Sequence, residues 1–251
     1  MLIPGIVSVT YRPLSPGQLL DAARCAGLSA VEWGGDVHVP HGDIGCAVRV
    51  GGMTRGAGLL PVSYGTYYRA GTYGADYPAV FSAMLETAAA LGTSHLRLWA
   101  GNANSGDVTQ EQRTALTDEL RHCAGLAAQY GMSLSFEYHS GTLTDTAASA
   151  VQLVTDIGED NVSLYWQPHQ FASHEDNCTD LALLLPYISN VHVFAWEGRQ
   201  RYSLSRHADR WQDYLSLLRS SGRDHALLLE FTPHDDPAEL GTEAETLLSL
   251  L

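Results

Sequence analysis

Four side chains with metal-ligand chemistry stand at the ends of successive apolar segments in the second half of the chain. They are Glu137, Gln167, His192 and Glu230. Two carboxylates, one imidazole and one amide oxygen suit a hard or borderline divalent ion, with Mn²⁺ first and Mg²⁺, Co²⁺ or Zn²⁺ as alternatives, and they leave positions for a substrate. The other interpretation is a buried polar network that satisfies its own hydrogen bonds without a metal. The residue types favour a divalent metal site.

These residues can meet only if the segments that carry them lie side by side. Short apolar segments alternate with stretches of helical spacing, and we expect strands near residues 5–11, 30–35, 59–65, 95–101, 133–139, 162–168, 190–196 and 226–232. Ser15 before Pro16 is a typical helix start, and Gly131 a typical helix end. Eight strand-helix units predict an α/β fold, a single (β/α)8 TIM barrel that forms one domain over residues 1–251, with its active site at the carboxyl ends of the strands.

Alternation along each expected strand assigns polar side chains to the barrel interior, because every second residue of a barrel strand points inward. In the segment 133–139 the apolar residues fall outward and Glu137 falls inward. The other inward residues are Glu32, His95, Arg97, Trp99, Ser133, Ser135, His139, Ser163, Tyr165, Gln167, His169, His192 and Glu230. Burying so many polar groups unpaired would cost several kcal/mol, so we expect a functional cavity at one mouth of the barrel.

The charge composition narrows the class of partner. The formal net charge is -14 and the isoelectric point is near 5.0, so nucleic acid and anionic membranes are poor partners. The chain contains no lysine, which excludes Schiff-base aldolase chemistry, a lysine-anchored pyridoxal cofactor and a P-loop. No signal peptide or membrane span is visible, so we expect a cytoplasmic protein that acts on a small molecule.

Several segments resemble the xylose isomerase-like TIM-barrel superfamily, in particular proteins described as sugar phosphate isomerase/epimerase. The resemblance covers nearly the whole chain and lies in "VEWGGDVHVPHGD", "SYGTYYRAG", "RLWAG", "SFEYHSGTLTD", "NVHVFAW" and "LLLEF". It implies one divalent metal held by Glu137, Gln167, His192 and Glu230. Gln167 stands where the family typically has Asp, and Gln170 stands where the family's Asp-x-x-His pattern has His. His169 is therefore an alternative ligand or a proton shuttle.

The resemblance also implies a reaction. We expect a metal-dependent isomerase or epimerase that acts on a sugar, keto-sugar or sugar phosphate, with a carbohydrate as the small-molecule partner. Glu137 and Glu230 would transfer protons through an enediolate, and His169 is a third catalytic candidate. A homo-oligomer is compatible with this interpretation. The alternatives are a lyase or dehydratase that eliminates from a 3-keto sugar, keto-glycoside or inosose, and a catalytically weak binding or partner subunit.

Further residues near the same mouth are candidates for substrate binding. They are Glu32, His38, Tyr64, Arg97, Trp99 and Arg201. An inward Arg97 equally predicts a structural ion pair with Glu32 or Glu137, because buried charges are usually paired. Aromatic residues at strand ends can form a wall against a sugar or simply pack. The arginines of the loop 196–211 can clamp an anion or face water.

Overall fold

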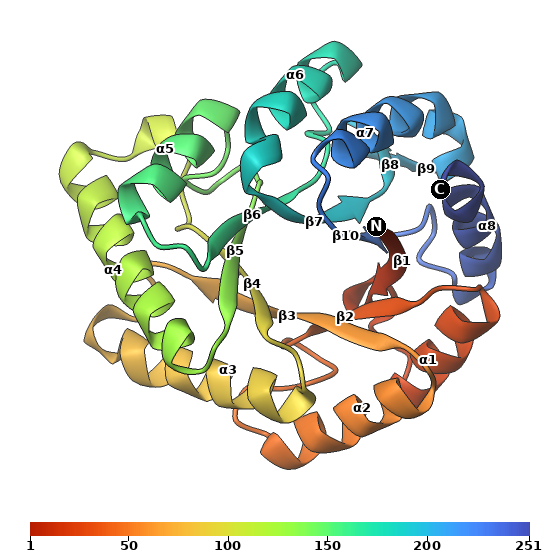
Figure 1. Cartoon of the computed structure of the whole chain (residues 1–251), viewed down its shortest axis with the longest axis horizontal. Helices are drawn as coiled ribbons and strands as arrows, with labels where there is room; N and C mark the ends of the chain where they lie inside the picture. Colours follow the sequence, from red (N-terminus) through yellow and green to blue (C-terminus); the bar gives the residue numbers. More distant parts are fainter.

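The computed structural model describes residues 1–251 and shows a closed barrel of eight parallel strands. Each strand pairs with its neighbour in the chain, and the last pairs with the first (Figure 1). The barrel strands are β1 (Leu2–Val7), β2 (Ala30–Gly34), β3 (Leu60–Arg69), β4 (His95–Trp99), β5 (Ser133–Glu137), β6 (Val162–Trp166), β7 (Ile188–Val193) and β10 (His225–Leu229). The predicted (β/α)8 TIM barrel is confirmed.

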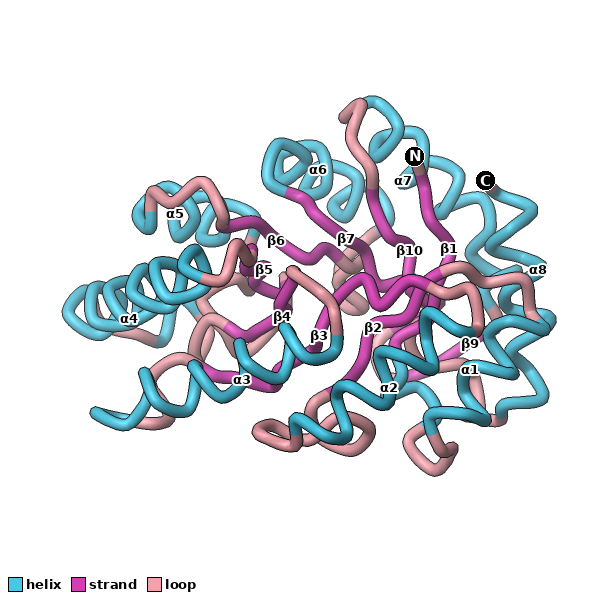
Figure 2. The backbone as a smooth tube through the Cα atoms, turned by 60° about the horizontal axis from the view of Figure 1, so that its bottom comes forward, coloured by secondary structure: helices cyan, strands magenta, loops and turns pink.

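One helix follows each barrel strand, and the helices form a ring outside the barrel (Figures 1 and 2). Ser15 begins the first helix with a capping box to Gln18, and Gly131 takes a left-handed φ of +66° just after the fourth helix, as the sequence predicted. The helices are α1 (Pro16–Cys25), α2 (Ile44–Gly56), α3 (Tyr77–Leu91), α4 (Gln110–Gln129), α5 (Ala147–Ile157), α6 (His174–Leu184), α7 (Ala208–Ser220) and α8 (Leu240–Leu250).

The first strand ends earlier than predicted. Residues 8–11 form a 3₁₀ helix, and the strand predicted over 5–11 is wrong there. The Ser8 hydroxyl accepts a hydrogen bond from the Gly34 N–H, and the Thr10 hydroxyl donates to the Leu229 carbonyl oxygen. These two side chains thus satisfy backbone groups of the neighbouring strands β2 and β10, where an extended strand would have used its own backbone.

A small antiparallel hairpin follows β7, which ends at Val193 although a strand was predicted to residue 196. Its strands are β8 (Ala195–Glu197) and β9 (Gln200–Tyr202). Gly198 makes the turn with a φ of +58° and donates its N–H to the Gln170 carbonyl oxygen at 2.7 Å. This bond ties the hairpin to the loop after β6, so two loops of the barrel mouth are joined.

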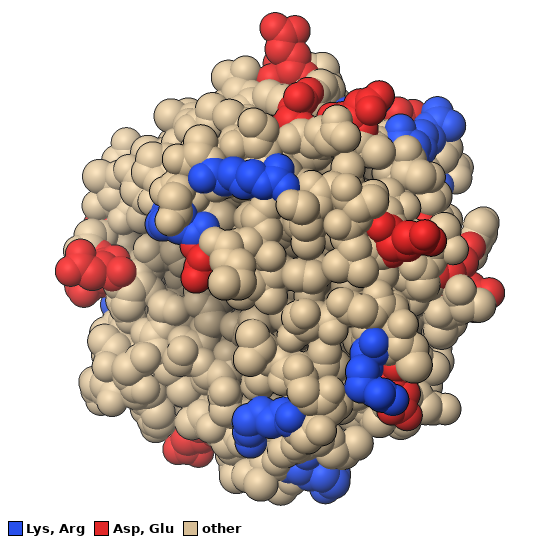
Figure 3. All heavy atoms as spheres, turned by 45° about the vertical axis from the view of Figure 1, so that its right-hand side comes forward, with Lys and Arg blue, Asp and Glu red and all other residues tan.

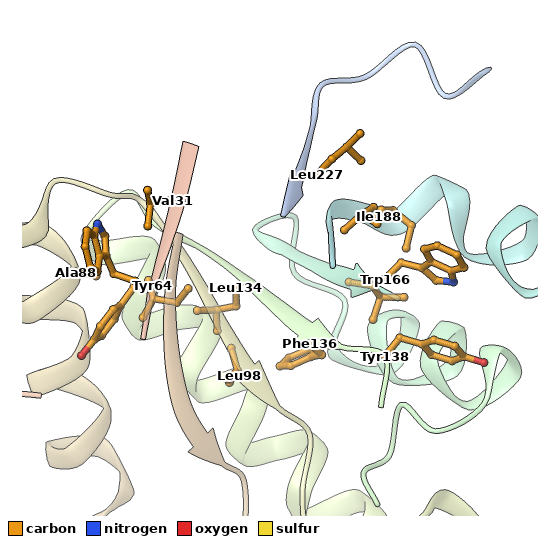
Figure 4. Packing of buried hydrophobic residues seen from close by; sticks show 14 of the residues in the cluster. Val31, Tyr64, Ala88, Leu98, Leu134, Phe136, Tyr138, Trp166, Ile188 and Leu227 are labelled. Atoms are coloured by element: carbon orange, nitrogen blue, oxygen red, sulfur yellow. The ribbon is translucent and has the colours of Figure 1, made fainter. Parts of the chain in front are cut away.

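Most of the apolar packing lies between the barrel and its helices. Leu134 and Phe136 of β5, Tyr138 just after β5 and Trp166 at the end of β6 all point to the outer side of the barrel (Figure 4). The outer layer contains 56 buried residues, whereas the apolar cluster inside the barrel contains 6. The outward alternation predicted for these strands is confirmed, and hydrophobic stabilisation comes mainly from the outer layer.

The barrel interior below the mouth is filled by polar side chains. The Ser135 hydroxyl lies 2.6 Å from the Ser163 hydroxyl, 2.7 Å from the Ser189 hydroxyl and 2.7 Å from His95 Nε2. These groups come from four neighbouring strands and satisfy one another, as buried polar groups must. They form a polar floor beneath the mouth of the barrel.

Basic side chains on the outer surface are scattered, and several of them lie beside acidic ones (Figure 3). On the face in Figure 3 the basic side chains are separate and have acidic side chains among them, without a continuous basic area. No helix combines the length and the apolar character needed to cross a bilayer.

Two neighbouring glycines of α2 provide a test of the outer packing. A Cβ at Gly51 would lie 2.0 Å from the Leu91 carbonyl oxygen at the end of α3, whereas a Cβ at Gly52 meets nothing within 4 Å. We expect Gly51→Ala to lower the free energy of unfolding by about 1–3 kcal/mol, because α2 must move away from α3. Gly52→Ala should raise it by roughly 0.5–1 kcal/mol, because alanine favours the helix. Urea denaturation of both variants checks this, and equal effects would contradict the packing.

Candidate active site at the barrel mouth

His192 lies at the centre of the polar groups at the mouth. Its Nδ1 is 3.1 Å from Gln167 Oε1, 3.4 Å from Glu230 Oε2 and 3.8 Å from Glu137 Oε1. Ligand atoms of Glu137, His192 and Glu230 all lie within 4.8 Å of one another. The structure therefore brings the four predicted ligand residues together around one imidazole nitrogen.

Parallel strand order explains this convergence. Glu137 is the last residue of β5 and His192 directly precedes the last residue of β7, while Gln167 and Glu230 come directly after β6 and β10. Parallel strands end at the same rim of a barrel, and these four positions all point inward in the alternation. The Glu230 N–H still donates to the Val193 carbonyl oxygen, so the backbone of Glu230 is fixed by the ladder.

Arg97 is buried beneath this group and holds two carboxylates. Its side chain is 2 % exposed, its Nε donates to Glu32 Oε1 at 2.7 Å, and its Nη1 donates to Glu137 Oε2 at 2.5 Å. The ion pair predicted for Arg97 is thus present with both candidate partners. A buried guanidinium with two carboxylates fixes the orientation of Glu137, because charge-assisted hydrogen bonds are strong in a dry interior.

A hydrogen-bonded chain extends from Glu32 across the barrel. Glu32 Oε2 accepts from the Ser63 hydroxyl at 2.8 Å, which lies 2.8 Å from the Tyr165 hydroxyl. Asn190 Nδ2 donates to the same Tyr165 oxygen at 3.1 Å, and the Tyr165 ring lies 5.0 Å from the His192 ring. Side chains of four strands therefore support the imidazole and the carboxylates from below.

The carboxylates differ in their preferred protonation state. Burial alone would raise the pKa of Glu137, but the charges of Arg97, His192 and His139 together outweigh it and hold the pKa below its usual range. Burial raises the pKa of Glu230, and the neighbouring Glu137 carboxylate raises it further against the effect of His192. The pKa of Glu32 is lowered, because Arg97 and His192 outweigh its burial. The two carboxylates that line the cavity therefore differ: the pKa of Glu137 is lowered and the pKa of Glu230 is raised.

The charge and the donor atoms fit a divalent metal. Glu32, Glu137 and Glu230 with Arg97 carry a formal charge of -2 when His192 is neutral, because three carboxylates face one guanidinium. A divalent cation would neutralise this buried charge. Carboxylate, imidazole and amide groups converge on one point, as a site for a hard or borderline ion requires.

A cavity of about 170 Å³ opens above these groups. Its polar wall contains the carboxylates Glu137 and Glu230, and five aromatic side chains and a histidine stand around them. The complete lining is Arg12, Tyr67, Arg97, Trp99, Glu137, His139, Gln167, Gln170, Phe194, Trp196, Glu230 and Phe231. A few convergent polar groups within an aromatic wall are typical of a site for one small molecule.

Two aromatic residues of the wall have left-handed backbones. Tyr67 has a φ of +56° and Phe231 a φ of +54°, although neither is glycine. Such conformations cost about 1–3 kcal/mol and persist where surrounding contacts impose them. The Phe231 N–H donates to the Thr10 hydroxyl, and the Tyr67 hydroxyl accepts from Arg12. Placing these two rings at the mouth therefore lowers the stability of the chain.

Two of the predicted substrate-binding residues lie in the outer layer. His38 is buried with its Nε2 3.0 Å from the Leu14 carbonyl oxygen, and the Tyr64 hydroxyl donates to the Val39 carbonyl oxygen at 2.7 Å. Tyr64 points outward from β3, as Figure 4 shows. Of the two tyrosines near the end of β3, Tyr67 lines the cavity and Tyr68 does not.

His169 also lies away from the cavity. It lines a separate surface hollow with Asp145 and Asp180 between α5 and α6. Its backbone N–H donates to Asn177 Oδ1 at 2.6 Å, which fixes the loop after β6 in this position. Gln167, two residues earlier, is therefore the residue of this segment that faces His192.

Three of the four arginines in the loop 196–211 are paired with carboxylates: Arg201, Arg206 and Arg210. Arg201 Nη1 lies 2.7 Å from Asp235 Oδ2 and its guanidinium lies 4.9 Å from the centre of the Trp196 ring. Arg206 Nη2 lies 3.6 Å from Glu197 Oε2. Neither arginine is among the cavity-lining residues, whereas Trp196 is.

The sequence interpretation missed four lining residues: Arg12, Gln170, Phe194 and Phe231. Each lies within four residues of the end of a barrel strand or of the 3₁₀ helix that extends β1. The only sequence signal for these residues was their position shortly after a strand. That signal does not identify a lining residue, because loop conformation decides which of these side chains turns toward the cavity.

Comparisons with known proteins agree with this architecture. The family described as "xylose isomerase-like TIM barrel" matches residues 20–250. A curated protein, 3-dehydroshikimate dehydratase from Bacillus anthracis, is 30% identical over 101 residues, which are 40% of this chain. The match spans 36% of that protein.

Solved structures share the fold along nearly the whole chain. A probable 3-DHS dehydratase from Bacillus anthracis has a TM-score of 0.83 at 19% identity, with 99% of each chain covered. The 3-keto-D-glucoside 4-epimerase from E. coli has a TM-score of 0.75 at 14% identity, with 100% of this chain and 99% of that chain covered. An L-ribulose 3-epimerase has a TM-score of 0.73 at 17% identity, with 100% and 94% covered. At these identities the likeness shows the fold alone.

Metal affinity should fall as the pH falls. Burial lowers the pKa of His192, but Glu230 and Glu32 outweigh this and raise it, so a proton competes with a metal for this imidazole. We expect the Kd for Mn²⁺ to rise about tenfold for each pH unit below the raised pKa, with release of about one proton on binding. Calorimetry in two buffers of different ionisation enthalpy measures both quantities. A Kd independent of pH would contradict the assignment of His192 as a ligand.

Gln167 and His169 can be separated as ligands by substitution. We expect Gln167→Leu to raise the Kd for Mn²⁺ by at least about tenfold, and Gln167→Asp to keep or lower it by adding a negative charge. His169→Ala is the matched control and should leave the Kd unchanged, because His169 lines another hollow. Metal titration of the three variants checks this. A loss of affinity in His169→Ala alone would assign the ligand to His169.

Proposed function

Because the chain belongs to the xylose isomerase-like TIM barrel family, we propose that it is an isomerase or epimerase of a sugar or keto-sugar. In this proposal the cavity at the barrel mouth binds the substrate, and a carboxylate removes a proton from the carbon next to the substrate carbonyl. The fold places the cavity at the carboxyl ends of the strands, where barrel enzymes have their active sites.

The observation that carries the proposal is the unequal pair Glu137 and Glu230. Glu137 is held by Arg97, which stabilises its ionised form. Glu230 lies 3.4 Å from His192 and has no arginine partner, and its pKa is raised. Two neighbouring carboxylates with different partners, one held by a buried arginine and one not, are suited to separate roles in proton transfer. We assign Glu230 as the group that accepts and returns the proton, and Glu137 as an ionised anchor.

Glu137, Gln167, His192 and Glu230 would hold a divalent metal, for which we propose Mn²⁺ first. When bound, the ion would act as a Lewis acid on the substrate carbonyl. The surrounding residues of the chain set the ionisation of the ligands and the shape of the cavity. Arg97 favours the ionised form of Glu137, Glu32 faces His192 Nε2 at 3.7 Å, and aromatic side chains line the cavity in which the substrate would react.

The aromatic wall also supports a carbohydrate or another hydroxylated ring as substrate. Tyr67 and Trp99 meet edge to face at 5.3 Å, and Trp196 and Phe231 lie 6.0 Å apart across the lining. Aromatic faces pack against the C–H face of a ring, while carboxylates and amides bind hydroxyl groups. Returning the proton from Glu230 to the neighbouring carbon gives an isomer, whereas an epimer forms when a second donor, Glu137 or solvent, delivers a proton to the opposite face of the original carbon.

A dehydratase is the second candidate. Its support is the segment of 101 residues that is 30% identical to a 3-dehydroshikimate dehydratase, together with the TM-score of 0.83 to a probable 3-DHS dehydratase. The same first step serves this reaction. After proton removal, a hydroxyl group on the next carbon leaves as water, and a double bond forms in place of a returned proton.

Deuterium exchange tests the shared first step. The Mn²⁺-loaded protein is incubated in D₂O with keto-sugars and with 3-dehydroshikimate, and C–H exchange is followed by NMR. We expect Glu230→Gln to slow exchange by about a hundredfold or more, because it removes the proton acceptor. Glu86→Gln, which removes a carboxylate from the exposed face of α3, should exchange at the parent rate. Equal exchange by parent protein and Glu230→Gln would remove Glu230 from this role.

The product distinguishes the two candidates. Exchange with a rearranged or inverted product of unchanged composition supports the isomerase or epimerase. A product lighter by one water, with new absorbance from a conjugated double bond, supports the dehydratase. Absence of exchange with every compound would count against both.

A further inference from the structure

Arg12 stands at the cavity rim and has no assigned role. We propose that Arg12 binds a carboxylate group of the substrate, so that the substrate is a hydroxylated acid. This inference rests on the proposed function for the location of the substrate. It adds the substrate class, which the proposed function does not name. Arg12 lines the cavity and its side chain is 41% exposed, so a ligand in the cavity can reach it.

Hydrogen bonds hold Arg12 without using all its donors. Its Nε donates to Asp36 Oδ2 at 2.8 Å, its Nη1 to the Val9 carbonyl oxygen at 3.3 Å and its Nη2 to the Tyr67 hydroxyl at 3.0 Å. A guanidinium has five N–H groups, so two have no acceptor in the protein. A fixed guanidinium with two free donors is suited to a carboxylate, which accepts two parallel hydrogen bonds.

The other arginines near the mouth are not available to bind a substrate carboxylate. Arg97 lines the cavity, but it is buried and holds Glu32 and Glu137. Arg201 is paired with Asp235 and does not line the cavity. Arg12 is therefore the cation of the lining that remains accessible to a ligand.

Charge favours a carboxylate over a phosphate. The mouth already contains the carboxylates Glu137 and Glu230, and Arg12 itself is paired with Asp36. A phosphate group carries nearly two negative charges at neutral pH, and it would face one shared cation and several carboxylates. A carboxylate adds only one negative charge, so it meets less repulsion beside Asp36, Glu137 and Glu230 than a phosphate does.

Equilibrium binding tests the inference without turnover. One set of probes shares a pyranose ring: D-glucuronate, D-glucose and D-glucose 6-phosphate. A second pair is shikimate and methyl shikimate. Calorimetry with the Mn²⁺-loaded protein should show that at least one carboxylate probe binds roughly 10- to 100-fold more tightly than its neutral and phosphorylated counterparts.

Substitution then assigns the difference to Arg12. Arg12→Gln should remove this preference, and Arg12→Lys should restore part of it, because lysine keeps the charge but not the planar fork. Arg49→Gln removes one arginine from the exposed face of α2 and should bind as the parent does. Thermal unfolding of each variant shows whether a loss of binding comes from a loss of folding. If Arg12→Lys melts at the temperature of the parent, its binding can be compared directly with that of the parent.

Three results would overturn the inference: binding of neither carboxylate, tighter binding of a neutral or phosphorylated probe, or an unchanged preference in Arg12→Gln. The proposed function fails separately, through absence of deuterium exchange. A protein that binds the carboxylates through Arg12 but exchanges no C–H hydrogen would keep this inference and lose the proposed reaction.

Discussion

The buried guanidinium of Arg97 is the constraint on which the barrel mouth depends. Removing such a charge from water is costly, and the structure compensates with Glu32 from β2 and Glu137 from β5. These partners fix the separation of strands on both sides of β4. Gly65 on β3 is part of the same constraint, because a Cβ there would lie 2.6 Å from Arg97 Nη2 and 2.9 Å from Glu32 Oε1. The ion pairs therefore limit the residue types of four consecutive strands, β2 to β5.

The polar interior and the apolar outer layer have different functions in this barrel. The outer layer between strands and helices supplies most of the buried apolar surface. The interior supplies defined hydrogen bonds, from the floor around Ser135 to the chain through Tyr165. A shift of one residue along any strand would exchange the two sets, so the alternation fixes the register and orients the candidate ligands together.

The alternation of inward and outward side chains was predictable from the sequence, because it depends only on strand geometry. The positions of Glu137, His192 and Glu230 along their strands were enough to place them together, since parallel strands end at one rim. Loop conformation was not predictable in this way. The left-handed backbone of Phe231 and the hairpin around Gly198 depend on contacts with distant segments, and no local pattern shows them. Arg201, predicted to bind substrate, is instead paired with Asp235 outside the cavity lining.

The bond between Gly198 and Gln170 has a consequence for loop motion. Gln170 and Trp196 both line the cavity, and the hydrogen bond of 2.7 Å joins the loops that carry them. If either loop moves aside to admit a substrate, it must carry the other loop with it or break this bond. Any opening that keeps this bond is therefore a concerted motion of the two loops.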